Sequence, residues 1–278
     1  MPRFFLQVGY KGTRFSGSQI QANALTVQAE LEKALFVYFR IPVELTGSSR
    51  TDAGVHALEN FYHFDLDPGA IEKHAWDQPG GAERSLYNLN AILPSDVVIG
   101  RVYPVSPDAH ARFDALSREY HYFVYRTKDP FMDDRGYYFP YSLDPDRLAE
   151  AAAIVLKNND FSSFSKRGAQ SRTPLCRIEE SVWQTDGATW RYTVRANRFL
   201  RGMVRGLVGT MLQVGRGKLS IADFEEVIRA ADPGKADFST PGRGLFLARV
   251  RYPEKLLDGR RPVEGASSAA EGDEGLVE

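Results

Sequence analysis

Residues 47–56 hold the arrangement of side chains best suited to chemistry in this chain. They read Gly-Ser-Ser-Arg-Thr-Asp-Ala-Gly-Val-His, so the Asp52 carboxylate lies between a basic residue and small ones. Small neighbours let a bulky molecule approach the backbone, and a guanidinium such as that of Arg50 favours the ionised carboxylate. An ionised, oriented carboxylate beside open space suits catalysis at a sugar carbon.

Other interpretations of this segment stay open from its residues alone. An aspartate in a Gly/Ser-rich loop usually bonds its own backbone in a turn. The loop of aspartic proteases is a poor match, because no second copy exists to form a carboxylate pair. A hydrolase that uses Asp52 and His56 is a further possibility, although we interpret His56 as an orienting or backbone-bonding histidine.

The motif Arg-Thr-Asp-Ala-Gly-Val-His at residues 50–56 resembles that of the TruA family of tRNA pseudouridine synthases. Further blocks resemble the family in the same order along about residues 3–252, and several collinear motifs are far rarer by chance than one. These blocks are Gly-Tyr-Lys-Gly-Thr-Arg-Phe-Ser-Gly-Ser-Gln (9–19), His-Ala-Arg-Phe-Asp-Ala (110–115), Arg-Glu-Tyr (118–120), Phe-Ser-Ser-Phe (161–164), Asn-Arg-Phe-Leu (197–200) and Pro-Gly-Arg-Gly-Leu (241–245).

The resemblance implies an α+β fold, the pseudouridine synthase fold. Two similar halves with largely antiparallel sheets would meet at a central, positively lined catalytic cleft, and the protein would be a homodimer. We place an N-terminal half with the aspartate loop at 1–108, a C-terminal half at 109–256, and an acidic, disordered tail at 257–278.

The resemblance also implies an isomerase that converts uridine to pseudouridine in the anticodon stem-loop of tRNA, at positions 38–40, without a cofactor or metal. Asp52 matches the family's nucleophile, which either attacks C1′ or removes a C2′ proton. Arg205 is the preferred partner for that carboxylate, with Arg50 as the alternative. Tyr120 would stack on the uracil, and its hydroxyl would take part in the transfer of the C5 proton. Leu245 would form one wall of the base pocket. A catalytically inactive tRNA-binding chaperone is the alternative.

Basic side chains are candidates for gripping the RNA backbone, because displacing a base from its stack costs a few kcal/mol that phosphate contacts must supply. Residues 165–172 read as a mobile basic loop. Any one of these charges alone is more often a solvated surface group. The candidates are Lys11, Arg14, Arg112, Lys166, Arg167, Arg172, Arg177, Arg198 and Arg201.

Small departures from the family pattern remove no catalytic group. Ser18 follows Gly17 where an aromatic residue is common, Ser49 precedes Arg50 where glycine is common, and the glycines at 202 and 206 are unusual. They leave room for a paralogue with an altered RNA target.

The composition is that of an ordinary water-soluble globular protein, with 278 residues and 43% hydrophobic residues. A single cysteine fits a reducing compartment, and without a secretion pattern or a membrane-length apolar run we expect a cytoplasmic protein. The net charge of -1 is misleading, because five acids and no base follow Arg261, which leaves residues 1–261 at +4.

Local signals predict the main elements. Alternating apolar residues predict strands near 4–8, 61–66, 97–103, 120–125 and 245–252, and Asp186-Gly187 divides a hairpin over 181–195. Thr26, Asp144-Pro145 and Ser220 begin helices, and 83–92 is a shorter one. A further helix is expected from Asn197 to Leu212, with Arg198, Arg201 and Arg205 on one face. Glycines 202, 206 and 209 lie beside them, and their cost of roughly 1 kcal/mol each indicates close packing.

Overall fold

The computed structural model describes residues 1–76, 78, 81–166, 173–257 and 263–264. Its strands are β1 (Arg3–Tyr10), β2 (Thr46–Gly47), β3 (His56–Asp65), β4 (Val97–Val105), β5 (Ser117–Tyr125), β6 (Tyr137–Tyr138), β7 (Ile178–Asp186), β8 (Thr189–Ala196), β9 (Leu245–Arg251) and β10 (Val263–Glu264). Its α-helices are α1 (Val27–Phe39), α2 (Pro68–Lys73), α3 (Gly81–Ile92), α4 (Pro145–Lys157), α5 (Met203–Gly215), α6 (Ile221–Arg229) and α7 (Glu254–Leu257).

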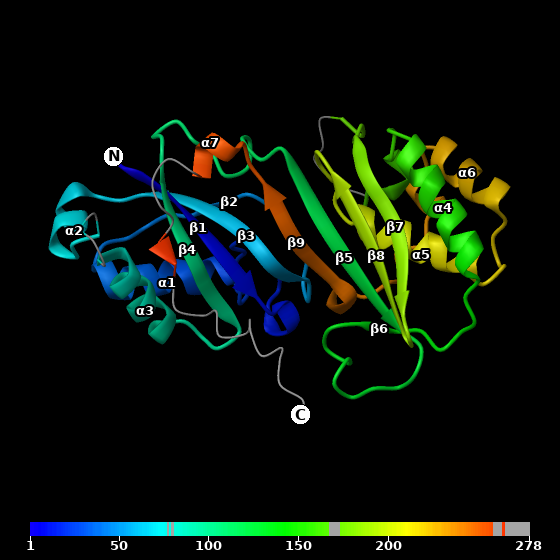
Figure 1. Cartoon of the computed structure of the whole chain (residues 1–278), viewed down its shortest axis with the longest axis horizontal. Coiled ribbons are helices and arrows are strands. Elements are labelled where there is room, and N and C mark those ends of the chain that lie inside the picture. The colour runs from blue at the N-terminus through cyan, green and yellow to red at the C-terminus, as the bar shows by residue number, and fades with distance from the viewer. Residues whose placement is uncertain (77, 79–80, 167–172, 258–262, 265–278) are drawn as a thin grey trace, which may run out of the picture.

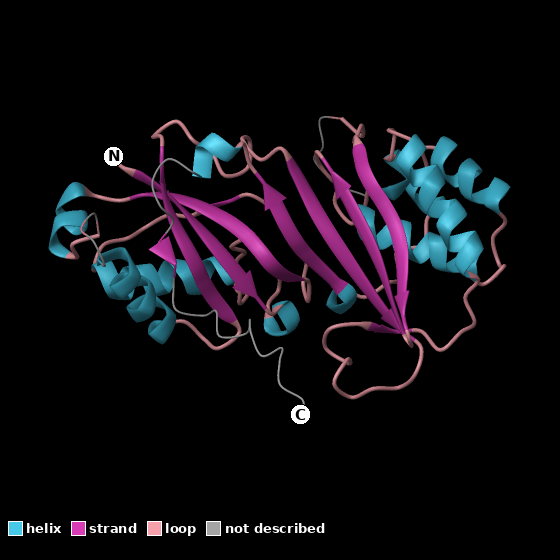
Figure 2. Cartoon of the chain, viewed as in Figure 1, coloured by secondary structure: helices cyan, strands magenta, loops and turns pink. Residues whose placement is uncertain are grey.

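One sheet runs through the whole molecule (Figures 1 and 2). Its order is β10-β4-β1-β3-β9-β5-β8-β7, with β2 beside β3 and β6 beside β5. Pairing is antiparallel except for β3 with β9 and β5 with β6. The α+β class with a largely antiparallel sheet is therefore confirmed. Helices α1–α3 lie near the N-terminal strands and α4–α6 near the C-terminal ones (Figure 1).

Strand β9 joins the N-terminal strands of the sheet, which end at β3, to the C-terminal strands, which begin at β5. It pairs with β3 only through His56 with Phe246 and Ala57 with Leu247, and it pairs with β5 along most of its length. Since these residues of β3 directly follow the Asp52 loop, the chain just before β9 is brought against that loop.

Three predicted helix starts are confirmed by their caps. The Thr26 hydroxyl accepts the Ala29 amide, and the Asp144 carboxylate accepts two amides of α4. Ser220 forms a reciprocal capping box with Asp223 at α6. The predicted hairpin is also present, as β7 and β8 paired antiparallel. Short-range hydrogen bonding fixes these features, which is why the sequence shows them.

The predicted start of the helix that carries Arg205 was wrong. Helix α5 begins at Met203, so Arg198 and Arg201 precede it and share no helical face with Arg205. The reason is Gly202, which has a left-handed φ of +76° and stands at the N-cap. A left-handed residue ends the regular right-handed geometry, so the helix does not extend toward Asn197.

Close packing beside the glycines of α5 is confirmed. A Cβ on Gly209 would lie 2.1 Å from the carbonyl oxygen of Asp237, and one on Gly206 would lie 2.8 Å from the Phe238 ring. The segment that leads to β9 therefore packs directly on the helix backbone. A side chain at either position would push that segment away.

The C-terminal region is described only in part. Helix α7 ends at Leu257, and Val263–Glu264 form β10, which pairs with β4. Residues 258–262 and 265–278 lie outside the described residues, so the disorder predicted for the tail stays a prediction. Among the described residues, none of the helices has the length and hydrophobicity needed to span a bilayer.

Candidate active site

Asp52 lies in the loop between β2 and β3, and its side chain is 32% exposed. Within the described residues its carboxylate accepts no hydrogen bond, and its one ionic partner is Arg205, at 3.6 Å between Oδ2 and Nη1. That distance is too long for a hydrogen bond. The carboxylate oxygens therefore remain available to a bound molecule while a cation stands beside them.

Arg205 is fixed by a reciprocal pair of hydrogen bonds. Its Nε donates to the Thr240 carbonyl at 2.7 Å, and the Thr240 hydroxyl donates to the Arg205 carbonyl at 2.8 Å. The guanidinium then presents Nη1 toward Asp52. Arg50, the alternative partner, is exposed and forms no ion pair with Asp52. The geometry thus places Arg205, rather than Arg50, at the carboxylate.

Ser18 holds the residue before Asp52. Its hydroxyl accepts the Thr51 amide at 2.9 Å, and its own amide donates to the Thr51 carbonyl at 3.1 Å. Gly17 precedes it with φ +115°, and a Cβ there would lie 2.8 Å from the Thr51 carbonyl oxygen. The serine that departs from the family pattern is therefore bonded directly to the aspartate loop.

A buried polar network supports the loop from inside. Asn60 is fully buried; its amide donates to the Ser49 carbonyl at 3.2 Å, and its oxygen accepts the Ser48 hydroxyl at 2.9 Å. The Tyr10 hydroxyl bonds the Thr51 hydroxyl at 2.8 Å. Asn60, Tyr10 and Thr51 each have a hydrogen-bond partner, which makes them a rigid support for the loop rather than a cost.

Arg118 links three parts of the chain around the site. Its guanidinium donates to four backbone carbonyls, those of Ser48, Arg112, Ala115 and Asn197. The aspartate loop, the segment before β5 and the chain entering α5 are therefore held at fixed separations. An arginine suits this task because its fork of donors is planar and always charged.

The turn before β9 packs against the loop of Asp52. A Cβ on Gly242 would lie 2.4 Å from the Ala53 carbonyl oxygen. His56 braces the same contact: Nδ1 accepts the Gly12 amide at 3.1 Å, and Nε2 donates to the Arg243 carbonyl at 3.1 Å. Burial lowers the pKa of His56, which favours the neutral ring. Because backbone groups bond both ring nitrogens, no lone pair is left to accept a proton from a substrate.

Tyr120 and Leu245 line the same region from β5 and β9. Tyr120 is 8% exposed and its ring meets Phe199 edge-on at 5.0 Å. Burial raises the pKa of Tyr120, and the nearby Tyr10 and Asp52 raise it further. The residue is therefore a neutral phenol near neutral pH, suited to stacking and to donating a hydrogen bond. Leu245 is 7% exposed and lies opposite Tyr122 in the sheet.

The predicted RNA-contact residues fall into different environments. Arg14 pairs with Asp96, Lys11 with Asp134 and Arg177 with Glu179. Arg198 is half-buried. Arg167 and Arg172 lie outside the described residues. The exposed candidates that pair with no carboxylate in the described part of the chain are Arg50, Arg112, Lys166 and Arg201.

Several residues of the site had no role in the sequence analysis. Asn60 and Thr240 act through contacts between distant segments, for which the sequence carries no local signal. Tyr10 lies in the block 9–19 that resembles the family. Arg118 stood within a family motif, which was the available signal. Arg243 also had no role in the sequence analysis. Its buried Nε has no hydrogen-bond partner among the described residues.

Comparison with known proteins gives one consistent result. A family model described as tRNA pseudouridine synthase matches residues 151–253. The chain is 45% identical to tRNA pseudouridine synthase A of Parabacteroides distasonis, covering 95% of this chain and 100% of the relative. It is 46% identical to that of Porphyromonas gingivalis (92% and 100%) and 36% identical to that of Bacillus licheniformis (88% and 97%). With its motifs, its mixed sheet and its exposed aspartate beside an anchored arginine, the chain belongs to the tRNA pseudouridine synthase A family.

Proposed function

We propose that this protein isomerises uridine to pseudouridine in tRNA, in the anticodon stem-loop at positions 38–40. The observation that carries the proposal is the Asp52 carboxylate. It is partly exposed, accepts no hydrogen bond from the described residues, and stands 3.6 Å from a fixed guanidinium. A structural aspartate would instead be bonded to its own turn.

The reaction breaks the C1′–N1 bond of a uridine and forms a C1′–C5 bond to the same base. C5 loses a proton and N1 gains one, so no electron or group donor is consumed. The ionised Asp52 either adds to C1′ or takes the C2′ proton. Arg205 stabilises the carboxylate as charge builds at the sugar. Tyr120 stacks on the freed base and relays the C5 proton: its hydroxyl oxygen accepts that proton while the hydroxyl hydrogen passes to solvent. Leu245 limits the orientations that the base can adopt.

Binding must supply the energy that removes the target base from its stack, a few kcal/mol. We assign this task to the basic side chains that the sequence analysis predicts to contact the RNA: Arg14, Arg50, Arg112, Lys166, Arg172, Arg198 and Arg201. A backbone-gripping mode suits a stem-loop, whose shape and phosphates are read more easily than its paired bases.

The wider organisation follows the family resemblance. We propose a homodimer that works in the cytoplasm, with halves at 1–108 and 109–256 meeting at a positively lined cleft. The position of β9, which follows α5 in the chain yet lies between β3 and β5, supports a site built where these halves join.

The test is pseudouridine mapping of tRNA incubated with the purified protein, and of tRNA from cells with and without its gene. We expect new pseudouridines at positions 38–40 only where the protein is present. Tight tRNA binding without any pseudouridine would support the inactive chaperone instead. Activity on small esters or glycosides without RNA would support the hydrolase.

A further inference from the structure

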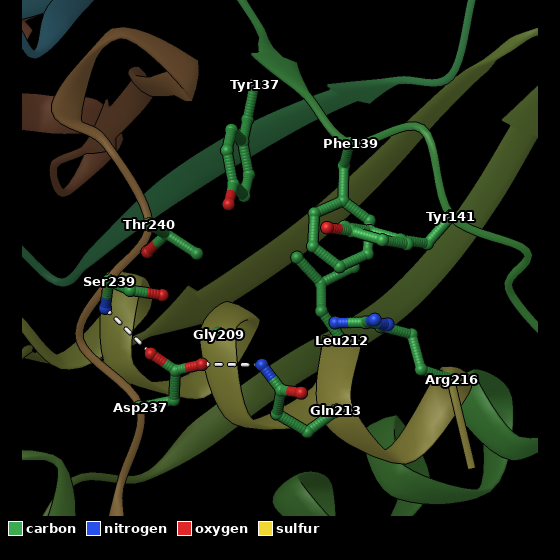
Figure 3. Close-up of a pocket in the computed structure, with 10 residues that line it drawn as sticks. All are labelled: Tyr137, Phe139, Tyr141, Gly209, Leu212, Gln213, Arg216, Asp237, Ser239 and Thr240. Atoms are coloured by element: carbon green, nitrogen blue, oxygen red, sulfur yellow. Dashed lines mark hydrogen bonds between the residues drawn. The ribbon is translucent and has the colours of Figure 1, made fainter. Parts of the chain in front are cut away.

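A second pocket lies along α5, on residues that follow Arg205 in the helix. Figure 3 shows the side chains that line it. It has a volume of about 210 Å³. Its walls are the second half of α5 with Arg216, the side chains of Tyr137, Phe139 and Tyr141, and the residues Asp237, Ser239 and Thr240. Pockets for drug-sized molecules are about 300–1,000 Å³. This one therefore suits one planar nucleobase rather than a whole nucleotide.

One wall of the pocket is aromatic. Tyr137, Phe139 and Tyr141 contribute it, and the Arg216 guanidinium lies 3.7 Å from the centre of the Tyr141 ring. Among the described residues, no carboxylate pairs with Arg216. Stacked aromatic and guanidinium planes are the surface on which unstacked nucleobases bind.

The opposite wall of the pocket is polar and includes the Asp237 carboxylate (Figure 3). Asp237 accepts the Ser239 amide at 2.8 Å through one oxygen and the Gln213 side-chain amide at 2.7 Å through the other. Burial opposes ionisation, but these hydrogen bonds hold the pKa of Asp237 below its usual value. Each oxygen has a second lone pair. The Tyr137 hydroxyl, across the pocket, has no hydrogen-bond partner in the described part of the chain.

We propose that this pocket is a second nucleobase subsite, which receives an unstacked base of the same RNA whose target uridine is at Asp52. The base stacks against the aromatic wall and donates its amino and ring N–H groups to Asp237. Guanine fits best, because its N1–H and N2–H are adjacent donors that one carboxylate can accept together. The inference rests on the proposed function, since it takes RNA as the ligand.

The pocket lies within reach of a neighbouring nucleotide. Gly209 is one helical turn beyond Arg205, and Arg216 is three turns beyond it. At a rise of about 1.5 Å per residue, the pocket extends over roughly 6–16 Å of the helix axis from the arginine. A base captured there would fix the position of the strand relative to Asp52.

The first test is photo-cross-linking in an Asp52→Asn background, which needs binding but no turnover. The protein carries p-benzoylphenylalanine at Tyr141, or at Tyr138 as the control, because Tyr138 packs on Tyr125 instead of lining the pocket. We expect the Tyr141 derivative to cross-link to a guanosine of bound tRNA and the Tyr138 derivative not to do so. Bound tRNA that gives no cross-link at position 141, or one only to bases without an amino group, would overturn the proposal.

The second test compares turnover of tRNA by wild type, Tyr137→Phe, Asp237→Asn and the control Tyr138→Phe. Tyr137→Phe removes a hydroxyl that bonds no other group among the described residues, so we expect the fold to be unaffected. We expect KM for tRNA to rise about tenfold for Asp237→Asn and by less for Tyr137→Phe. In both variants kcat should be unchanged. The control Tyr138→Phe should have the KM and kcat of wild type. Inosine in place of the cross-linked guanosine should reproduce the rise with wild-type enzyme. Unchanged KM in both variants would refute the subsite, whereas a wild type that makes no pseudouridine would refute the proposed function.

Discussion

Two side chains from distant parts of the chain form the proposed chemical centre. Asp52 stands in a loop before β3, and Arg205 stands in the first turns of α5. Arg205 makes two different contacts at once, with Nε on the Thr240 carbonyl and Nη1 toward Asp52. Only a guanidinium has the rigid fork to do both.

Arg205→Lys should therefore lower kcat by about 100-fold with little change in KM for tRNA. A lysine ammonium is a single point charge, so it reaches either the Thr240 carbonyl or the carboxylate but does not hold both. The measurement is single-turnover pseudouridine formation at saturating tRNA, with thermal melting to verify the fold.

The matched control is Arg229→Lys, which keeps the charge on an exposed side chain of α6 that has no assigned role in the site. We expect its kcat to equal that of wild type. An Arg205→Lys protein with wild-type kcat would show that the contact with Asp52 is incidental.

At the residue scale, the sequence predicts the reacting group better than its support. The prediction that Asp52 reacts rests on its small neighbours and on the family motif, which are both visible in the sequence. By contrast, Asn60 reaches Ser49, and Ser18 reaches Thr51, only because the strands and loops have already assembled. No spacing along the chain encodes contacts of this kind.

Helix α5 and the segment before β9 act as one structural unit at the next scale. The segment carries Thr240, which holds Arg205, and Gly242, which packs on the Asp52 loop. Its distance from α5 is set by Gly209, where a Cβ would lie 2.1 Å from the Asp237 carbonyl oxygen.

We expect Gly209→Ala to destabilise the protein by about 1–3 kcal/mol, although alanine is the better helix former by about 1 kcal/mol. The obstacle is a backbone carbonyl, so relief requires the whole segment to move. Urea unfolding measures the free energy of unfolding for wild type and variant.

Gly206→Ala provides the comparison, because its Cβ would meet the Phe238 ring, a side chain that can turn away. Its cost should be clearly smaller than that of Gly209→Ala. A reversed order, or a stabilised Gly209→Ala protein, would contradict the proposed packing.

Element boundaries were predictable where local bonding decides them. Thr26, Asp144 and Ser220 cap their helices through contacts two or three residues away. The start of α5 was not predictable, because the periodic apolar residues continue back to Leu200. Gly202 has a left-handed φ and packs beside Lys166 and Phe238, and it keeps α5 from extending toward the N-terminus.

The five histidines share one property across the whole molecule. Burial lowers the pKa of every one of them: His56, His63, His74, His110 and His121. The largest described effect is at His63, whose pKa falls to about 4 through burial and the neighbouring His110 and Arg3. The folded protein therefore binds fewer protons than the unfolded chain in mildly acidic solution.

The free energy of unfolding should therefore fall as the pH drops from about 6.5 toward 4. Over this range the histidines of the unfolded chain bind protons, whereas those of the folded protein, with their lower pKa, stay largely neutral. His63 alone should contribute about 2–3 kcal/mol over that range. Urea midpoints at a series of pH values measure the slope.

His63→Asn tests the assignment, since an amide oxygen can replace the Nδ1 that accepts the Ala111 amide. The variant should show a shallower loss of stability between pH 6.5 and 4. A slope identical to that of wild type would mean that other groups cause the acid sensitivity.

The α+β class and the strands were predictable from alternation and turns, but the strand order was not. Strand β9 lies between β3 and β5, although it follows both by a long stretch of chain. Its two residue pairs with β3 involve His56 and Ala57, whose sequence gives no hint of a parallel partner. Pairings between segments so far apart depend on the assembled core.

The most direct measurement of the central claim is tritium release from [5-³H]uridine tRNA by Asp52→Asn. The change keeps the shape of the side chain and removes its charge. Glu83→Gln, at an exposed carboxylate of α3, serves as the control. We expect Asp52→Asn to bind tRNA as wild type does and release no tritium, while the control releases it at the wild-type rate. Tritium release by Asp52→Asn at the wild-type rate would contradict the role of this carboxylate.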